Sequence, residues 1–325
     1  MKIKHLFVLC CFSLILAPIY VGQIWAQAPT TAKIAFASNR GGNWDIYIMN
    51  PDGSEQKRVT QSSAGDYSPV WSPNGEQILF VSNREGVYDL YVIDADGRRV
   101  RRVFRKLVLR IQPTWSSDGE RIAFHTQKPQ WKPEWNIQTA TIYGADVQDV
   151  AEVVQQGGYP SWSPDGNEIA FVDYVNDARR IRIITLDSGK VRTFLPKESP
   201  WMATPAWSPD GNRLAFNWYK WGIAGRPPAI FVANRDGSGL KRVVKSQWRV
   251  FGPAWSPEGD KLAYIEQGDN DSFQIFVVDI RTGVRKQLTD EGLNTSPAWF
   301  DPKSLSVAPR PHLLTTTWGK IKNQN

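Results

Sequence analysis

The chain has 325 residues, 41% of them hydrophobic, and a formal net charge of +7. This length and apolar content are sufficient for a sizeable buried core. The basic residues are spread along the chain and form neither a zinc-finger spacing nor a basic helix, which argues against nucleic acid as a partner.

Residues 1–26 have the pattern of a secretory signal peptide. Lys2 and Lys4 form a short positive segment, the stretch from His5 to Val21 is largely apolar, and small residues follow it. We expect cleavage after Ala26, which would place the mature protein in the periplasm or outside the cell. The alternative is an uncleaved N-terminal anchor, although this apolar run is at the short end for crossing a bilayer.

The cysteine content sets the redox chemistry of the mature chain. Both cysteines, Cys10 and Cys11, lie within the signal segment, so the mature chain has none and forms no disulfide. No later apolar run approaches the length of a membrane-spanning helix. We therefore expect no transmembrane segment in the mature chain.

A seven-residue phrase recurs along the chain. Its clearest copy is Pro-Ala-Trp-Ser-Pro-Asp-Gly at 205–211, followed by an apolar segment at 214–216. The tryptophan of the phrase returns every 44–48 residues, at Trp71, Trp115, Trp162, Trp207, Trp255 and Trp299. A period of about 40–50 residues is the size of a four-stranded propeller blade. We predict that these six tryptophans are core residues of the repeat.

The predicted elements follow one order in every unit. The array begins in mid-repeat with a strand at 34–38, a strand at 45–50, a turn at 51–53 and a strand that ends at Thr60. Each later unit starts with a strand that carries the tryptophan, a Ser-Pro-Asp-Gly turn and an alternating second strand. A loop, a third strand, an Asp-Gly turn and a fourth strand complete the unit.

The two ends of the array complement each other. The first unit lacks the tryptophan strand, and the last copy of the phrase, at 297–299, supplies one. We therefore predict an all-β fold: a six-bladed β-propeller of four-stranded antiparallel blades, closed by N- and C-terminal strands that share one blade. The domains would be a signal peptide at 1–26, the propeller at 27–302 and a C-terminal extension at 303–325. The segment 305–307 also resembles a second strand and competes with 34–36 for the same position.

The repeat resembles that of a known family. Trp-Ser-Pro-Asp-Gly-x-x-Ile/Leu-Ala-Phe, followed by Asp-Ile-Tyr-Val and an Asp-Gly turn, is similar to the WD40-like (PD40) β-propeller repeat of the TolB family over about residues 33–300. The resemblance implies a six-bladed propeller in the periplasm or outside the cell, and a protein-binding role. TolB itself has an α/β domain ahead of its propeller, whereas here few residues separate the signal segment from the first blade. We therefore interpret the chain as a stand-alone TolB-like propeller.

The irregular parts of the repeat point to one face of the propeller. The loops between second and third strands, and those between blades, lie on the same face, and here they contain tryptophans interleaved with basic residues. Exposed aromatic residues with arginine are typical of protein interfaces, and aromatic faces also stack on sugars. The candidate binding residues are Trp131, Trp135, Trp201, Trp218, Trp221, Trp248, Arg110, Arg226 and Arg249. The alternative is that these rings pack the loops onto the propeller.

The sequence contains no recognisable catalytic constellation. It has no Gly-x-Ser-x-Gly elbow, and only His125 and His312 remain after the signal segment, too few for a His-rich metal site. We expect His125 to be structural. The segment 94–97 resembles the start of a calcium loop but lacks the rest of the ligand series, so it is predicted to be a turn. We expect no cofactor. Binding of calcium by acidic residues in the central channel is an alternative that the sequence leaves open.

These observations favour an exported, non-catalytic binding or scaffold propeller. It would be a monomer that engages a protein or peptide at its loop-rich face, with a glycan as a less favoured ligand. The alternative is a cell-envelope enzyme, a lyase or a glycan-active protein, that uses carboxylates in the channel.

Overall fold

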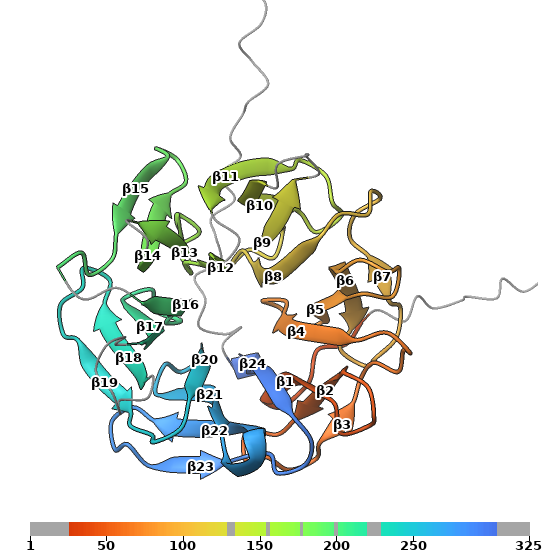
Figure 1. Ribbon diagram of the computed structural model, residues 1–325. Coiled ribbons are helices and arrows are strands. Elements are labelled where there is room, and N and C mark those ends of the chain that lie inside the picture. Colours follow the sequence, from red (N-terminus) through yellow and green to blue (C-terminus); the bar gives the residue numbers. More distant parts are fainter. Residues whose placement is uncertain are drawn as a thin grey trace, which may run out of the picture.

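The computed structural model describes residues 26–128, 134–153, 157–175, 178–197, 201–219 and 229–303. Six sheets of four antiparallel strands surround a common axis, as Figure 1 shows. Within the described ranges η1 (Asp269–Asp271) is a short 3₁₀ turn, and none of these residues forms a helix long and apolar enough to cross a membrane. The predicted all-β, six-bladed propeller is confirmed.

The four strands of each blade are called a to d, in order from the axis of the ring to its rim (Figure 1). Blade 1 contains β24 (Asn294–Phe300), β1 (Lys33–Ser38), β2 (Asp45–Met49) and β3 (Lys57–Arg58). Blade 2 contains β4 (Asp66–Trp71), β5 (Gln77–Ser82), β6 (Asp89–Asp94) and β7 (Arg101–Arg102). Blade 3 contains β8 (Arg110–Trp115), β9 (Arg121–Lys128), β10 (Glu134–Thr141) and β11 (Gln148–Val153).

The second half of the ring repeats the same order. Blade 4 contains β12 (Gly158–Trp162), β13 (Glu168–Val175), β14 (Ala178–Thr185) and β15 (Lys190–Thr193). Blade 5 contains β16 (Met202–Trp207), β17 (Arg213–Trp218), β18 (Ala229–Asn234) and β19 (Lys241–Val244). Blade 6 contains β20 (Val250–Trp255), β21 (Lys261–Gln267), β22 (Phe273–Asp279) and β23 (Arg285–Gln287).

The ring closes within blade 1. The C-terminal strand β24 pairs antiparallel with the N-terminal strand β1, with Trp299 opposite Ile34 and Ala298 opposite Ala35. The predicted sharing of one blade by the two chain ends is therefore correct, and β1 takes the position next to the tryptophan strand. The competing segment 305–307 lies outside the described residues, as do residues 1–25 of the predicted signal peptide.

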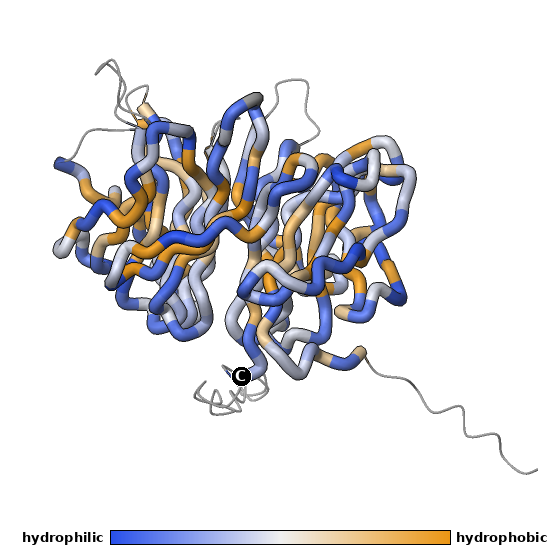
Figure 2. Tube along the Cα trace, turned by 90° about the horizontal axis from the view of Figure 1, so that it is seen from below, coloured by the Kyte–Doolittle hydropathy of each residue, from blue (hydrophilic) through white to orange (hydrophobic). Residues whose placement is uncertain are grey.

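The hydrophobic core is divided into six clusters, and each cluster joins two neighbouring blades. At the seam, Phe36 and Met49 of blade 1 pack with Ile275 and Leu288 of blade 6. Figure 2 shows hydrophobic segments within the body of the ring and many hydrophilic ones at its two ends. Each sheet is therefore stabilised mainly by the blades beside it.

The tryptophans of the repeat lie between blades. Four of them are 7–8% exposed, namely Trp71, Trp115, Trp207 and Trp255, while Trp162 and Trp299 are partly buried. The indole Nε1 of Trp255 donates a hydrogen bond to the Ala206 carbonyl oxygen in the preceding blade at 2.9 Å. The ring of Trp71 lies 5.5 Å from that of Phe300, also in the preceding blade. In these two cases the tryptophan connects its own blade to the one before it.

The tight turn after each tryptophan is fixed by its serine. The buried Oγ of Ser208 accepts a hydrogen bond from the Arg213 amide at 2.9 Å and donates to the Asp210 carboxylate. Asp210 in turn accepts from the Asn212 amide at 3.1 Å, and Gly211 has the positive φ of 69° that the turn requires. Ser116 and Ser163 make the same contacts in their blades.

All six inner strands contain a bulge that the sequence analysis did not predict. In every blade the residue before the proline of the repeated phrase has a φ between 48° and 64°. These residues are Ser68, Gln112, Tyr159, Thr204, Gly252 and Ser296. The pairing register slips at the same place. Proline has no amide hydrogen to donate to the neighbouring strand, and a bulge accommodates that loss.

Replacing Trp207 by alanine should lower the free energy of unfolding by about 3–5 kcal/mol, because a buried aromatic side chain between two blades is lost. Guanidinium denaturation measures this change. Val284→Ala, at a position that is 68% exposed, serves as the control and should shift stability by less than about 0.5 kcal/mol. An unchanged midpoint in the Trp207 variant would contradict the assignment of this residue to the core.

Candidate functional site

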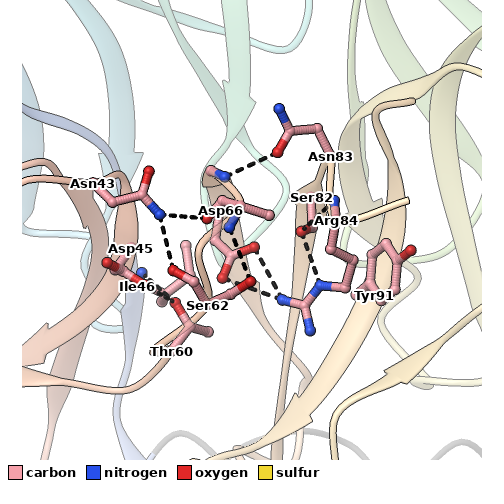
Figure 3. Close-up of polar contacts among 12 residues, drawn as sticks. Asn43, Asp45, Ile46, Thr60, Ser62, Asp66, Ser82, Asn83, Arg84 and Tyr91 are labelled. Carbon is pink, nitrogen blue, oxygen red and sulfur yellow. Dashed lines mark hydrogen bonds and ion pairs between the residues drawn. The ribbon is translucent and has the colours of Figure 1, made fainter. Parts of the chain in front are cut away.

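The loop-rich face is the end of the propeller where strand b connects to strand c and where each blade connects to the next. In blades 1 and 2 it is formed by residues 39–44, 61–65 and 83–88. These short loops carry the repeated triplet Ser-Asn-Arg, at 38–40 and 82–84. The polar contacts of this region are drawn in Figure 3.

Arg84 fixes the loop of blade 2 to a buried carboxylate. Its Nε donates to Ser82 Oγ at 3.0 Å, and its Nη2 donates to Asp66 Oδ1 at 3.0 Å (Figure 3). Asp66 is fully buried, and the guanidinium lies 4.7 Å from the ring centroid of Tyr91. The charge of the arginine is therefore neutralised inside the fold, and the loop is held in place.

Asp45 occupies the same position in blade 1 as Asp89 in blade 2, at the first residue of strand c. It is fully buried, forms an ion pair with Arg58 at 2.5 Å, and accepts a hydrogen bond from Thr60 Oγ1 at 3.1 Å. Burial raises the pKa of Asp45, and Arg58 opposes that shift. Nearby, the amide of Asn43 donates to the carbonyl oxygens of Ser62 and Ala64 (Figure 3).

Arg110 also belongs to this internal network, which corrects its assignment to the partner-facing set. It is 7% exposed, and its Nη1 donates to Asp89 Oδ1 at 3.0 Å. Its guanidinium carbon lies 3.7 Å from the ring centroid of Phe104. Burial raises the pKa of Asp89, while Arg110 opposes the shift. The ion pair links the start of blade 3 to blade 2 and leaves little of Arg110 for a partner.

The other sequence candidates fall into three groups. Trp135 and Trp218 are each 9% exposed; Trp135 lies 4.7 Å from the ring of His125, and Trp218 lies 5.0 Å from the ring of Phe231, so their burial favours the packing alternative. Trp201 and Trp248 are partly buried, and Arg249 is exposed. Trp131, Trp221 and Arg226 lie outside the described residues.

Three aromatic residues that the sequence analysis missed gather at the loop-rich face of blades 1 and 2. The ring centroid of Tyr67 lies 5.5 Å from that of Trp44 and 5.8 Å from that of Tyr88. Tyr88 is 40% exposed and follows Val87, which is 37% exposed. Burial raises the pKa of Tyr67, and the neighbouring Tyr88 adds to the shift. We call Trp44, Tyr67 and Tyr88 the aromatic cluster.

A periodic signal in the sequence could have revealed this cluster. One position at the start of strand c is aromatic in four of the six blades. Its residues are Trp44, Tyr88, Trp135 and Phe273. The rings of Phe251 and Phe273 in blade 6 lie 5.6 Å apart, in positions equivalent to those of Tyr67 and Tyr88. The pattern is hidden because the ring type changes from blade to blade.

A second group of residues lies at the same face of blades 4 to 6. The amide of Trp201 donates to the Arg179 carbonyl oxygen at 2.7 Å, and the amide of Tyr219 donates to the Trp201 carbonyl oxygen at 2.8 Å. Burial and the nearby Tyr159 raise the pKa of Tyr219, whereas Arg179 and Arg249 act in the opposite direction. Trp201 and Arg249 were candidates from the sequence; Tyr159, Arg179 and Tyr219 were not.

His125 is a buried imidazole between blades 3 and 4. It is 1% exposed, neither ring nitrogen has a hydrogen-bond partner, and burial lowers its pKa to about 4. Gly158 packs so closely that a β-carbon there would lie 2.5 Å from His125 Nδ1. The imidazole is therefore neutral at pH 7.

The described residues contain no group of three or more His, Cys, Asp or Glu side chains placed to hold a metal ion. The segment 94–97 forms a turn, in which the Gly97 amide donates to the Asp94 carbonyl oxygen at 2.9 Å and the Arg98 amide to Asp96 Oδ1 at 3.0 Å.

Comparison with known proteins identifies the type of propeller. Residues 21–156 match the PD40 family, described as the TolB beta propeller domain. A stretch of 49 residues is 43% identical to the Tol-Pal system protein TolB of Geobacter sulfurreducens. Over residues 21–156 the chain resembles the TolB β-propeller domain. The Geobacter match covers 15% of this chain and 11% of that protein.

Solved structures extend the likeness to the whole TolB-like ring. TolB from Acinetobacter baumannii has a TM-score of 0.72 at 18% identity, over 82% of this chain and 66% of the other. A TolB candidate from Agrobacterium tumefaciens has a TM-score of 0.65 at 21% identity, over 83% of this chain and 92% of the other. At such identities the likeness shows the fold. The chain spans slightly less than two thirds of the Acinetobacter protein.

The stability of the propeller should fall as the pH drops from about 6.5 towards 4. An unfolded histidine titrates near 6.5 and folded His125 near 4, so the unfolded state binds more protons in this window and protonation favours unfolding. The shift corresponds to roughly 3 kcal/mol at the acid end. Urea denaturation between pH 7 and about 4 should show that His125→Phe has a flatter pH dependence than the native protein. Equal slopes would rule out this contribution.

Removing one partner of the Arg110–Asp89 pair should be costly. Arg110→Met leaves the buried carboxylate without its counter-charge, and we expect a loss of about 3–5 kcal/mol in chemical denaturation. Adding Asp89→Asn to the same chain should recover part of that loss. Arg98→Met is the matched control, because the side chain of Arg98 is 69% exposed. A neutral Arg110→Met variant would contradict a structural role for the pair.

Proposed function

We propose that this protein is an exported binding propeller that holds a protein or peptide partner at its loop-rich face. The observation that carries the proposal is the aromatic cluster of Trp44, Tyr67 and Tyr88, which is partly exposed at that face. Tyrosine and tryptophan are enriched among the residues that dominate binding energy at protein interfaces. The TolB-like fold supports the same class of function.

The scaffold beneath the cluster favours binding with little reorganisation. Arg84 ties the loop that precedes Tyr88 to buried Asp66, and the Asn43 amide holds the loop beside Trp44 through two carbonyl oxygens. A surface that is already ordered loses less conformational entropy when a partner binds. The same loops present Tyr88 and Val87 to solvent.

The cellular setting is part of the proposal. The pattern of residues 1–26 supports export to the periplasm or beyond, and we propose that the mature protein acts there as a monomer. The name of the Geobacter relative assigns that protein to the Tol-Pal system. For this chain, we propose a partner from the cell envelope without assigning it to that system.

The second candidate function is that of a cell-envelope enzyme, either a lyase or a glycan-active protein. Such an enzyme needs carboxylates that converge on a substrate. At the loop-rich face of blades 1 to 3 the buried carboxylates Asp45, Asp66 and Asp89 are each bound by an arginine of the fold. This geometry supports binding better than catalysis.

Affinity capture from the envelope fraction of the source organism tests the proposal. Tyr88→Ala should reduce recovery of the partner captured by the native protein at least about tenfold, because it removes an exposed interface ring. Its melting temperature should stay close to the native value, since Tyr88 is 40% exposed. The matched control is Tyr143→Ala, which removes a 77% exposed tyrosine from the turn between β10 and β11 at the opposite end. Full recovery by a stable Tyr88→Ala protein would count against this face.

A further inference from the structure

The arginines of the loop-rich face divide into two groups. In blades 1 to 3, Arg58 pairs with Asp45, Arg84 with Asp66 and Arg110 with Asp89, whereas the side chain of Arg40 is bound by Ser38, Gln56 and Asn294. In blades 4 to 6, Arg179 and Arg249 have no carboxylate partner within the part of the chain that the structure describes. Arg179 and Arg249 therefore lack the internal counter-charge that Arg58, Arg84 and Arg110 have.

The carboxylates nearest in the sheet to these two arginines are already engaged. Asp173 lies on β13 beside the start of β14, and it pairs with Arg182 at 3.6 Å. Glu266 lies opposite Val250, next to Arg249, and it is held by Arg285 and by Ser246 Oγ. Neither carboxylate is bound by Arg179 or Arg249 in the described contacts.

The positions of the buried aspartates are occupied differently in blades 5 and 6. Strands a and c of blades 1 and 2 include the buried acidic first residues Asp45, Asp66 and Asp89. The equivalent positions of blades 5 and 6 include Met202, Ala229 and Val250. None of these three positions in blades 5 and 6 carries a carboxylate that could bind a neighbouring arginine.

Arg179 and Arg249 lie near the hydroxyl groups of tyrosines. Arg179 Nε donates to the Tyr174 hydroxyl at 2.9 Å, and the Arg179 carbonyl oxygen accepts from Trp201, which in turn accepts from the Tyr219 amide. Tyr219 interacts electrostatically with Arg179 and Arg249, and also with Tyr159, which is 38% exposed. Among the residues that the structure describes here, the group is rich in donors and includes no acidic side chain.

We propose that Tyr159, Arg179, Tyr219 and Arg249 form a binding site for an acidic peptide segment of the partner. Guanidinium groups bind carboxylates through paired, charge-assisted hydrogen bonds, and the phenol hydroxyls donate to the same oxygens. Tyrosine, tryptophan and arginine together are the composition of protein-binding hot spots, which favours a peptide over an acidic glycan. This inference deepens the proposed function and depends on it, because it assigns the chemistry of the partner at the same face.

Calorimetric titration with defined probes tests the site. The probes are a short unstructured peptide of alternating Glu and Gly, its counterpart with Gln for Glu, and an oligo-uronate of matched charge. The native protein should bind the Glu peptide about tenfold more tightly than the Gln peptide at low salt, with about threefold from each arginine. The preference should shrink as ionic strength rises from about 0.02 to 0.3 M, because salt screens exposed charges.

Two variants connect the preference to the site. Arg179→Gln combined with Arg249→Gln should abolish the preference for the Glu peptide. Arg281→Gln, at an exposed arginine on the opposite end of blade 6, should keep it. The inference is overturned if both peptides bind alike, if the double variant keeps the preference, or if the uronate binds more tightly than the Glu peptide.

The capture assay separates this inference from the proposed function. A double variant that recovers the envelope partner as well as the native protein does overturns the acidic-segment site. The binding proposal itself is tested by Tyr88→Ala, on the other side of the ring, and stands or falls with that variant.

Discussion

The pairing of β24 with β1 is the contact on which the rest of the structure depends. Every hydrophobic cluster joins two blades, so no sheet buries both of its faces alone. If the seam between blades 6 and 1 opened, the apolar surfaces around Phe36 and Ile275 would face water. Sharing one blade between the chain ends makes the sixth interface equivalent to the other five. The positions of all the loops at one face follow from that closure.

Ion pairs as well as hydrogen bonds to the backbone hold the loops of the loop-rich face in place. Buried aspartates at the first residues of strands bind arginines, and two of these arginines also cover aromatic rings, as Arg84 covers Tyr91 and Arg110 covers Phe104. Buried ion pairs carry a desolvation cost, so their value here lies in fixing loop geometry more than in net stability. The aromatic cluster depends on this arrangement, because Tyr88 follows the loop that Arg84 anchors.

Much of the fold could be predicted from sequence, and less of the site. The spacing of Trp71 to Trp299 predicts six blades because one large apolar side chain must fill the same place between successive sheets. The hydrogen bonds of Ser208 and the bulge at Thr204 were not predicted, since they depend on which backbone groups the pairing leaves free. Trp135 and Trp218 resembled loop residues, but both lie in strands and pack against neighbouring rings, which composition alone does not reveal.

The repeat also explains where new chemistry can arise. Positions between blades, such as those of Ile34 and Phe36, are constrained by packing on both sides. The first residues of strands a and c are buried at the loop-rich end, where the position holds an ion-paired aspartate in one blade and an apolar core residue in another, as Asp66 and Met202 show. In blades 1 and 2 these positions keep aspartates that bind the fold's own arginines, whereas blade 5 has Met202 and Ala229. Three arginines of blades 1 to 3 are thus paired internally with buried aspartates. The opposite side presents Arg179 and Arg249 without internal counter-charges in the described chain, and that difference is the physical basis for directing an acidic ligand to one side of a pseudo-symmetric face.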